Sequence, residues 1–192
     1  MDQLGDPFDA ICAVFGSGAG LAYLGEGVTM VEHQFQAAAH ASAAGSQPSL
    51  IVAALVHDIG HMTGPTNDGL DATTALAEQI DARHDVTGAR WLSRWFGPDV
   101  TEPVRLHVAA KRYLVATDPA YLDRLSPASI ATLHLQGGPM SAEEIHAFSN
   151  HPSRDAAIAL RWFDEAAKDP LVESPPLSAY ADLIRSVAAM PT

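Results

Sequence analysis

Apolar residues recur along this chain at intervals of three and four, which is the spacing of an amphipathic α-helix. Sustained alternation of apolar and polar residues, as expected of a half-buried β-strand, is not found. The pattern therefore predicts an all-α protein. The expected helices cover residues 7–15, 29–44, 48 to about 61, 72 onward with a break near 81, 84–96, 101–115, 153–168 and 178–189, with short helices starting at 118 and 126.

Several helix ends carry recognisable capping signals. Thr29-Met30-Val31-Glu32 and Ser141-Ala142-Glu143-Glu144 both have the spacing of a capping box. On the helix that begins at Thr29, one set of residues is expected to pack inward and a second set to share the neighbouring face. The first set is Val31, Phe35, Ala38 and Ser42, and the second is His33, Gln36, Ala37 and His40.

The chain shows no internal repeat, low-complexity tract or linker, and its 192 residues suit one hydrophobic core. We therefore expect a single domain over residues 1–192, with the helix at 178–189 packed across the outside. The net charge of -12 argues against nucleic acid and anionic membranes as partners. The single cysteine, Cys12, and the lack of a signal peptide or membrane-length apolar run predict a cytoplasmic protein.

The most informative stretch is His57-Asp58-Ile59-Gly60-His61, which follows the apolar run at residues 50–56. A carboxylate beside imidazoles at the end of a buried helix is costly unless a partner satisfies it. A bound cation would satisfy His57 and Asp58 together. The alternative is a helix C-terminus at which the histidines cap carbonyl groups and Asp58 faces water.

Further metal-ligand residue types lie on other predicted helices. In chain order the candidates are His33, His57, Asp58, His84, His107 and Asp164. One histidine, the His57-Asp58 pair and a distant aspartate would complete one site. His84 and His107 are then surplus, unless Asp58 bridges to a second ion. The remaining histidines have no such companions, and surface or core roles are favoured for His40, His134, His146 and His151.

Two cationic residues are placed near these candidates. Lys111 follows His107 by one helical turn, where it would be repelled by a metal unless an anion also binds. A solvated lysine is the alternative. Arg161 precedes Asp164 by three residues, so it either forms an ordinary ion pair or orients a ligand and clamps an anion.

The order His, His-Asp, His, His, Asp on helices resembles the HD-domain superfamily and, more closely, its PhnZ-type diiron oxygenases, with myo-inositol oxygenase more distant. The resemblance covers about residues 20–168. It rests on a set of short motifs: Tyr23-Leu24-Gly25-Glu26, Glu32-His33, His57 to His61, Arg83-His84, Arg105 to Leu114, Leu125 to Ser129, Leu135 to Gly138, and Arg161 to Asp164.

The resemblance implies an HD-domain helical bundle around a dinuclear metal site. His33, His57, Asp58 and Asp164 would hold one iron, and Asp58 would bridge to a second iron held by His84 and His107. Lys111, Ser129 and Arg161 match positions that bind the phosphonate group. Tyr23, Glu26 and His61 match residues that close over the substrate, and His61 is also a substrate-binding candidate.

The implied cofactors are two iron ions in the mixed-valent Fe(II)/Fe(III) state, with dioxygen as co-substrate. The implied reaction cleaves the carbon–phosphorus bond of a small 1-hydroxyalkylphosphonate, and 2-amino-1-hydroxyethylphosphonate, giving glycine and phosphate, is the first candidate. The competing interpretation is an HD-type phosphohydrolase in which the same residues activate water against a phosphate ester. A regulator with a defective metal site would lack ligands, and none is missing. The oligomeric state is not predicted.

Overall fold

The computed structural model describes residues 5–18, 21–23, 26–63 and 83–188. Across these ranges the chain forms helices and no strand, so the all-α prediction is confirmed. One isolated antiparallel bridge pairs Ala22 with Thr29. The helix predicted from residue 72 lies outside the described residues. The α-helices are α1 (Pro7–Gly18), α2 (Met30–Ala43), α3 (Pro48–Val56), α4 (Gly60–Thr63), α6 (His84–Leu92), α7 (Pro98–Thr117), α8 (Pro127–Leu135), α9 (Ala142–Ser149), α10 (Arg154–Ala166) and α11 (Ala181–Val187).

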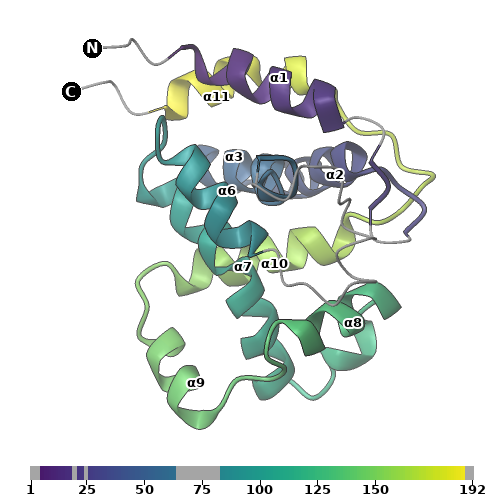
Figure 1. The fold of residues 1–192 in the computed structure, drawn as a ribbon, viewed down its shortest axis with the longest axis vertical. Helices are drawn as coiled ribbons and strands as arrows, with labels where there is room; N and C mark the ends of the chain where they lie inside the picture. Colours follow the sequence, from purple (N-terminus) through teal and green to yellow (C-terminus); the bar gives the residue numbers. More distant parts are fainter. Residues whose placement is uncertain (1–4, 19–20, 24–25, 64–82, 189–192) are drawn as a thin grey trace.

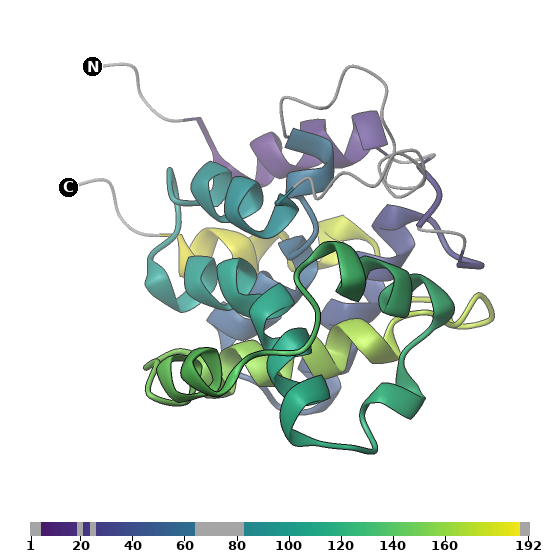
Figure 2. The same ribbon diagram turned by 60° about the horizontal axis from the view of Figure 1, so that its bottom comes forward.

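Five helices form the centre of the fold. α2 packs on α3 and α10, and α7 packs on α3, α6 and α10 (Figures 1 and 2). α3 is apolar on all sides, and Val52, Ala53, Ala54, Leu55 and Val56 are completely buried within it. The apolar run at residues 50–56 is therefore the core helix on which the others pack.

Two layers flank this centre. α1 and α11 lie side by side over α3 at one end, and α8 and α9 lie at the opposite end (Figure 1). The terminal helical segment consists of a 3-10 turn, η2 (Leu177–Tyr180), followed by α11, whose Ile184 is fully buried. No helix in the described ranges is long and apolar enough to cross a membrane.

Both predicted capping boxes are confirmed. Thr29 accepts from the amide of Glu32 while the Glu32 carboxylate accepts from the amide of Thr29, and Ser141 and Glu144 repeat this pair of bonds at α9. Each satisfies two amide groups that a helix start leaves without a partner.

The inward face predicted for α2 is confirmed except at Ser42. Ala38 is fully buried and Val31 and Phe35 are partly buried against the core, whereas Ser42 is exposed. On the neighbouring face His33, Gln36 and Ala37 are buried as well. The reason is that α2 is covered by α3 on one side and by α10 on the other, so the mixed histidine and glutamine face is enclosed as well.

Several predicted helix limits also differ. α7 begins at Pro98 instead of residue 101, because a proline at the first helical position is favourable and the later Pro103 is accommodated inside the helix. α6 ends at Leu92 instead of residue 96. No helix starts at residue 118, because the Asp118 carboxylate accepts from the amide of Ala120 and forms a turn. A short 3-10 helix, η1 (Leu122–Arg124), follows it.

Candidate metal centre

The six candidate ligands come from the helices at the centre of the bundle. His33 lies on α2, His57 caps the end of α3, His84 begins α6, His107 lies on α7 and Asp164 on α10. All six residues, Asp58 included, are at most 7% exposed. Residues far apart in sequence are thus brought into one buried polar cluster.

The chain does not continue as helix through the motif, as would be needed for His57 and His61 to share one face. α3 ends at Val56, residues 57–59 form turns, and α4 starts at Gly60. This break turns Asp58 into the space between two groups of histidines.

The first group consists of His33, His57, Asp58 and Asp164. The Nε2 atoms of His33 and His57 are 3.1 Å apart. Asp58 Oδ2 lies 3.8 Å from His33 Nε2 and 3.5 Å from His57 Nε2, and Asp164 Oδ1 lies 3.3 Å and 3.9 Å from the same two atoms. The donor atoms of His33, His57 and Asp58 therefore converge on one point, and Asp164 Oδ1 lies beside the same two imidazoles.

The second group uses the other oxygen of the same carboxylate. Asp58 Oδ1 lies 3.3 Å from His84 Nε2 and 3.5 Å from His107 Nε2, and these two nitrogens are 3.0 Å apart. Donor atoms about 2.1 Å from one ion and at right angles to each other lie about 3.0 Å apart, and wider angles give longer separations. Both groups have the dimensions of a divalent metal site, and Asp58 is common to the two.

Main-chain carbonyl groups set the tautomers of three histidines. His33 Nδ1 lies 2.7 Å from Ala167 O, His57 Nδ1 lies 2.8 Å from Ala54 O, and His107 Nδ1 lies 2.6 Å from Val104 O. Because a carbonyl oxygen can only accept, each Nδ1 carries the proton and each neutral ring presents a lone pair at Nε2.

This arrangement fits a cation. Neutral His33 and His57 cannot hydrogen-bond through Nε2 atoms that both carry lone pairs, so the approach to 3.1 Å is repulsive unless a positive charge lies between them. Imidazole and carboxylate donors suit iron, manganese and zinc alike. The two groups would therefore hold a pair of divalent ions, with three or four protein ligands at the first and three at the second.

The protonation states agree with metal binding. Burial lowers the pKa of His57, and it lowers the pKa of His107 to about 3. Burial opposes ionisation of Asp58, but the imidazoles of His57 and His84 outweigh it and hold the pKa of this carboxyl well below its usual range. Burial also disfavours the charged form of His84, but the Asp58 carboxylate raises its pKa above the ordinary value, and a metal would take the place of that proton.

A cluster of cations lies beside the first group. Arg161 donates to Asp164 Oδ2 through Nη1, to the Tyr121 hydroxyl at 2.7 Å, and to Ser129 Oγ at 3.4 Å. Lys111 is 4% exposed and donates to Thr132 Oγ1 at 2.9 Å. The three residues predicted to hold an anion, Lys111, Ser129 and Arg161, are all buried around α8.

The chain was compared with known proteins. A family model for the HD domain matches residues 30–145. The 1-hydroxy-2-(trimethylamino)ethylphosphonate dioxygenase (glycine-betaine-forming) of Leisingera caerulea is 44% identical over 163 residues, which cover 85% of this chain and 81% of the relative. The hydroxymethylphosphonate dioxygenase of Gimesia maris is 40% identical over 167 residues, 87% of this chain and 81% of the relative. The chain belongs to the HD-domain family, in its PhnZ-type oxygenase branch.

An uncharacterized protein of Acanthamoeba polyphaga mimivirus is also similar, with 33% identity over 185 residues, 96% of this chain and 83% of the relative. The family and the enzyme class predicted from the sequence are confirmed. The individual roles of the site residues stay predictions, for which the geometry of this HD-domain oxygenase is the support.

Tyr23 and His61 lie at the edge of the metal centre of this oxygenase, and the amide of Glu26 donates to the carbonyl of Tyr23 at 2.7 Å. The Tyr23 ring stacks on His33 with centroids 3.8 Å apart, and its hydroxyl donates to Asp164 Oδ1 at 3.4 Å. The His61 ring stacks on His84 with centroids 3.9 Å apart. The Glu26 Oε1 atom is buried and has no hydrogen-bond partner among the described residues. Tyr23 thus contacts the first metal group and His61 the second.

The histidines predicted to have other roles stay away from the centre. His134 and His146 are exposed, His151 lies near Glu102, and His40 Nε2 is 3.2 Å from Ala166 O. The His40 contact to Ala166 lies next to the His33 contact to Ala167, because α2 presents both imidazole rings to the end of α10.

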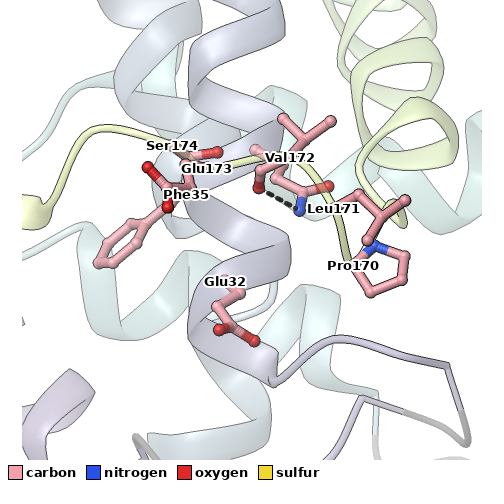
Figure 3. Close-up of a pocket in the computed structure, with 8 residues that line it drawn as sticks. Glu32, Phe35, Pro170, Leu171, Val172, Glu173 and Ser174 are labelled. Carbon is pink, nitrogen blue, oxygen red and sulfur yellow. Dashed lines mark hydrogen bonds between the residues drawn. The ribbon is translucent and has the colours of Figure 1, made fainter.

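Sequence reasoning missed four residues around the cations: Tyr121, Thr132, Glu165 and Lys168. A signal existed for two of them, because Glu165 and Lys168 follow Arg161 by four and seven residues and share its helix face. It also missed Gln36, whose amide binds the segment after α10. Gln36 Nε2 donates to the carbonyls of Asp169 and Val172, at 2.7 and 3.3 Å (Figure 3 shows the bond to Val172).

Proposed function

We propose that this protein uses dioxygen to cleave the carbon–phosphorus bond of a 1-hydroxyalkylphosphonate at a mixed-valent diiron centre. The observation that carries the proposal is the position of Asp58, whose two carboxylate oxygens face two separate imidazole pairs. The buried cations beside His33 and His57 offer a place for the phosphonate group. The activities after which the two dioxygenase relatives are named agree with both observations.

In this proposal His33, His57, Asp58 and Asp164 hold one iron, and Asp58, His84 and His107 hold the other. When bound, the iron pair supplies the redox chemistry with dioxygen and the Lewis acidity that polarises the substrate hydroxyl. The protein contributes the fixed tautomers, the exclusion of water from a buried cluster, and the orientation of the substrate.

The overall reaction balances without a further reductant. R-CH(OH)-PO3H2 and O2 give R-COOH and H3PO4, so the carbon is oxidised, its bond to phosphorus is broken and both atoms of dioxygen are consumed. The carbon must be oxidised before the carbon–phosphorus bond breaks. Without oxidation, cleavage would have to expel a saturated hydroxyalkyl carbanion from phosphorus, and this is a poor leaving group.

The phosphonate would bind to Lys111, Ser129 and Arg161. Arg161 is fixed from two sides, by Tyr121 and by Asp164, so its guanidinium is oriented before an anion arrives. Because Asp164 is also a candidate iron ligand, Arg161 connects the phosphonate group directly to the first metal position. Tyr23, Glu26 and His61 would close over the substrate.

For the rest of the substrate we propose 2-amino-1-hydroxyethylphosphonate as the first compound to assay. Its ammonium group would find a carboxylate in Glu26, whose Oε1 atom is buried and lacks a hydrogen bond to any described residue. A trimethylammonium group prefers aromatic faces. Tyr23 is only 5% exposed and one face of its ring is covered by His33, which favours the primary amine.

The deciding experiment measures iron content after anaerobic purification, then phosphate release and dioxygen consumption with this compound. Trimethylammonium and unsubstituted hydroxymethyl analogues are assayed beside it. We expect phosphate and glycine to appear only with dioxygen, in equal amounts. Phosphate release from ordinary phosphomonoesters without dioxygen, and none from any hydroxyphosphonate with it, would instead establish a phosphohydrolase.

A further inference from the structure

The sequence contains two lysines, Lys111 and Lys168, against nine arginines. Lys111 is buried and Lys168 is largely covered, and both side chains contact α8. The Lys111 residue is 4% exposed and the Lys168 side chain 11% exposed. In an acidic protein with a net charge of -12, neither lysine therefore serves as a solvated surface cation.

Lys168 contacts Ser129 directly, whereas Lys111 contacts Thr132 on the same helix. Lys168 follows the end of α10, and its Nζ lies 3.0 Å from Ser129 Oγ and 3.5 Å from Ser126 Oγ. Ser129 Oγ also accepts from Arg161 Nη2 at 3.4 Å. A hydroxyl has two acceptor lone pairs and one proton, so these two cations occupy its acceptors and leave its proton to be donated. Ser129 is thereby prepared as a donor to an anion.

Glu165 orients both cations. Its Oε1 accepts from Lys168 Nζ at 2.9 Å and its Oε2 accepts from Arg161 Nη2. With Lys111 protonated, the three cations Lys111, Arg161 and Lys168 stand against two carboxylates, Glu165 and Asp164, both of which bind Arg161. The cluster then carries one net positive charge, and loss of the Lys168 charge would leave it neutral, which would weaken a dianion more than a monoanion.

We propose that Lys168 is a further phosphonate-binding residue, and that it gives the site its preference for a dianion over a monoanion. The inference rests on the proposed function only in taking the anion to be a phosphonate. Its physical basis is that the partly buried Lys168 ammonium group, which is within hydrogen-bond distance of the Ser129 hydroxyl, lies within reach of an oxygen that Ser129 binds. The competing role is structural: Lys168 would simply tie the end of α10 to α8.

The experiment compares Lys168→Met and Lys168→Arg with the iron-loaded parent protein. The matched control is Arg154→Met, which removes one charge from α10 at an exposed ion pair with Asp155. Calorimetry measures the Kd of inorganic phosphate. It also compares the Kd of methylphosphonate with that of its methyl ester, which can only be a monoanion. Steady-state assays give KM and kcat separately, and iron content and Tm are measured for each protein.

We expect Lys168→Met to raise the Kd of phosphate and the KM of the substrate about tenfold or more, with kcat and iron content nearly unchanged. The same variant should lose most of the preference for methylphosphonate over its ester. Lys168→Arg should restore much of the binding, and Arg154→Met should change neither constant. If Lys168→Met does not fold, Lys168→Gln, which keeps a donor and removes the charge, makes the same comparison.

An unchanged phosphate Kd in Lys168→Met together with a lowered Tm would overturn the proposal and assign Lys168 a structural role. Because phosphate binding is measured without turnover, this result is independent of the reaction. Failure of the parent protein to cleave any hydroxyphosphonate would count against the proposed function, while the phosphate measurements would still decide the role of Lys168.

Discussion

Gly60 lies directly against the main chain of His84. A Cβ atom added to Gly60 would lie 1.9 Å from the carbonyl oxygen of His84 and 2.8 Å from the amide nitrogen of Gly88. The start of α4 therefore touches the start of α6 as closely as two backbones can, and this contact brings His84 beside Asp58.

Gly60→Ala is expected to displace α6 and to remove His84 from the second metal group. We expect the variant to lose about one of two equivalents of iron and nearly all activity, because a contact of 1.9 Å with backbone can be relieved only by moving a helix. Metal analysis of the purified protein measures this. Gly16→Ala is the control, since a Cβ there meets nothing within 4 Å. Full iron content in Gly60→Ala would refute the dependence of His84 on this contact.

Asp58→Ala should abolish both metal positions together, because one carboxylate serves both. We expect total iron well below about one equivalent, compared with about two in the parent protein. His134→Ala, at an exposed histidine outside the centre, should retain the parent iron content. A stable Asp58→Ala protein with close to one equivalent would show that one site forms without the bridge.

Lys111→Met should weaken substrate binding and leave the iron content intact, since Lys111 Nζ is held by Thr132 and not by a candidate ligand. KM should rise about tenfold or more. If the KM of the variant equals that of the parent protein, Lys111 does not bind the substrate and its role is structural.

The same lysine predicts a dependence on pH. Burial and then the nearby Arg161 lower the pKa of Lys111 to about 7. Below that pH the lysine already carries its charge, and above it binding of the phosphonate must be accompanied by uptake of a proton, so KM should rise with pH. Lys111→Arg, which stays charged, should show a flatter profile, and comparing the two proteins cancels the ionisation of the phosphonate itself. Parallel profiles would contradict the assignment.

Gln36→Leu tests the attachment of the segment that follows α10. The Gln36 side chain donates to the carbonyls of Asp169 and Val172 and accepts from the amide of Asp169, and the variant would remove these three hydrogen bonds. We expect a loss of about 1–3 kcal/mol in the free energy of unfolding. Thermal denaturation measures it, and His40→Ala, which removes a neighbouring contact to Ala166, should cost less. Equal losses of unfolding free energy in Gln36→Leu and His40→Ala would show that the Gln36 hydrogen bonds stabilise the protein no more than the His40 contact does.

Much of the fold was predictable because its signals are local. Helical spacing, two capping boxes and the apolar run at residues 50–56 each specify structure within a few residues. The break at His57 to Ile59 was not predicted, because the close packing of Gly60 on α6 causes it and that contact joins segments more than twenty residues apart.

The candidate ligands were predictable for a different reason, since His and Asp at predicted helix positions are few and match a known family order. The partners that hold them were not. Ala54, Val104 and Ala167 act through carbonyl groups, which every residue has, so no residue type marks them in the sequence. Lys168 and Glu165 were overlooked because an isolated charged pair at the end of a helix usually lies in solvent.

Three of the ring nitrogens that face away from the metals bind main-chain atoms, and His33 is the special case. His57 and His107 each use a carbonyl three residues earlier in their own segment, whereas His33 depends on α10 for both of its nitrogens. Asp164 Oδ1 lies 3.3 Å from His33 Nε2, and Ala167 O lies 2.7 Å from His33 Nδ1. The three-residue spacing from Asp164 to Ala167 therefore places one oxygen atom beside each nitrogen of the His33 ring. No replacement of the Ala167 side chain can remove its carbonyl, but inserting or deleting one residue in this interval would move either the Ala167 carbonyl away from His33 Nδ1 or Asp164 Oδ1 away from the metal position beside His33 Nε2.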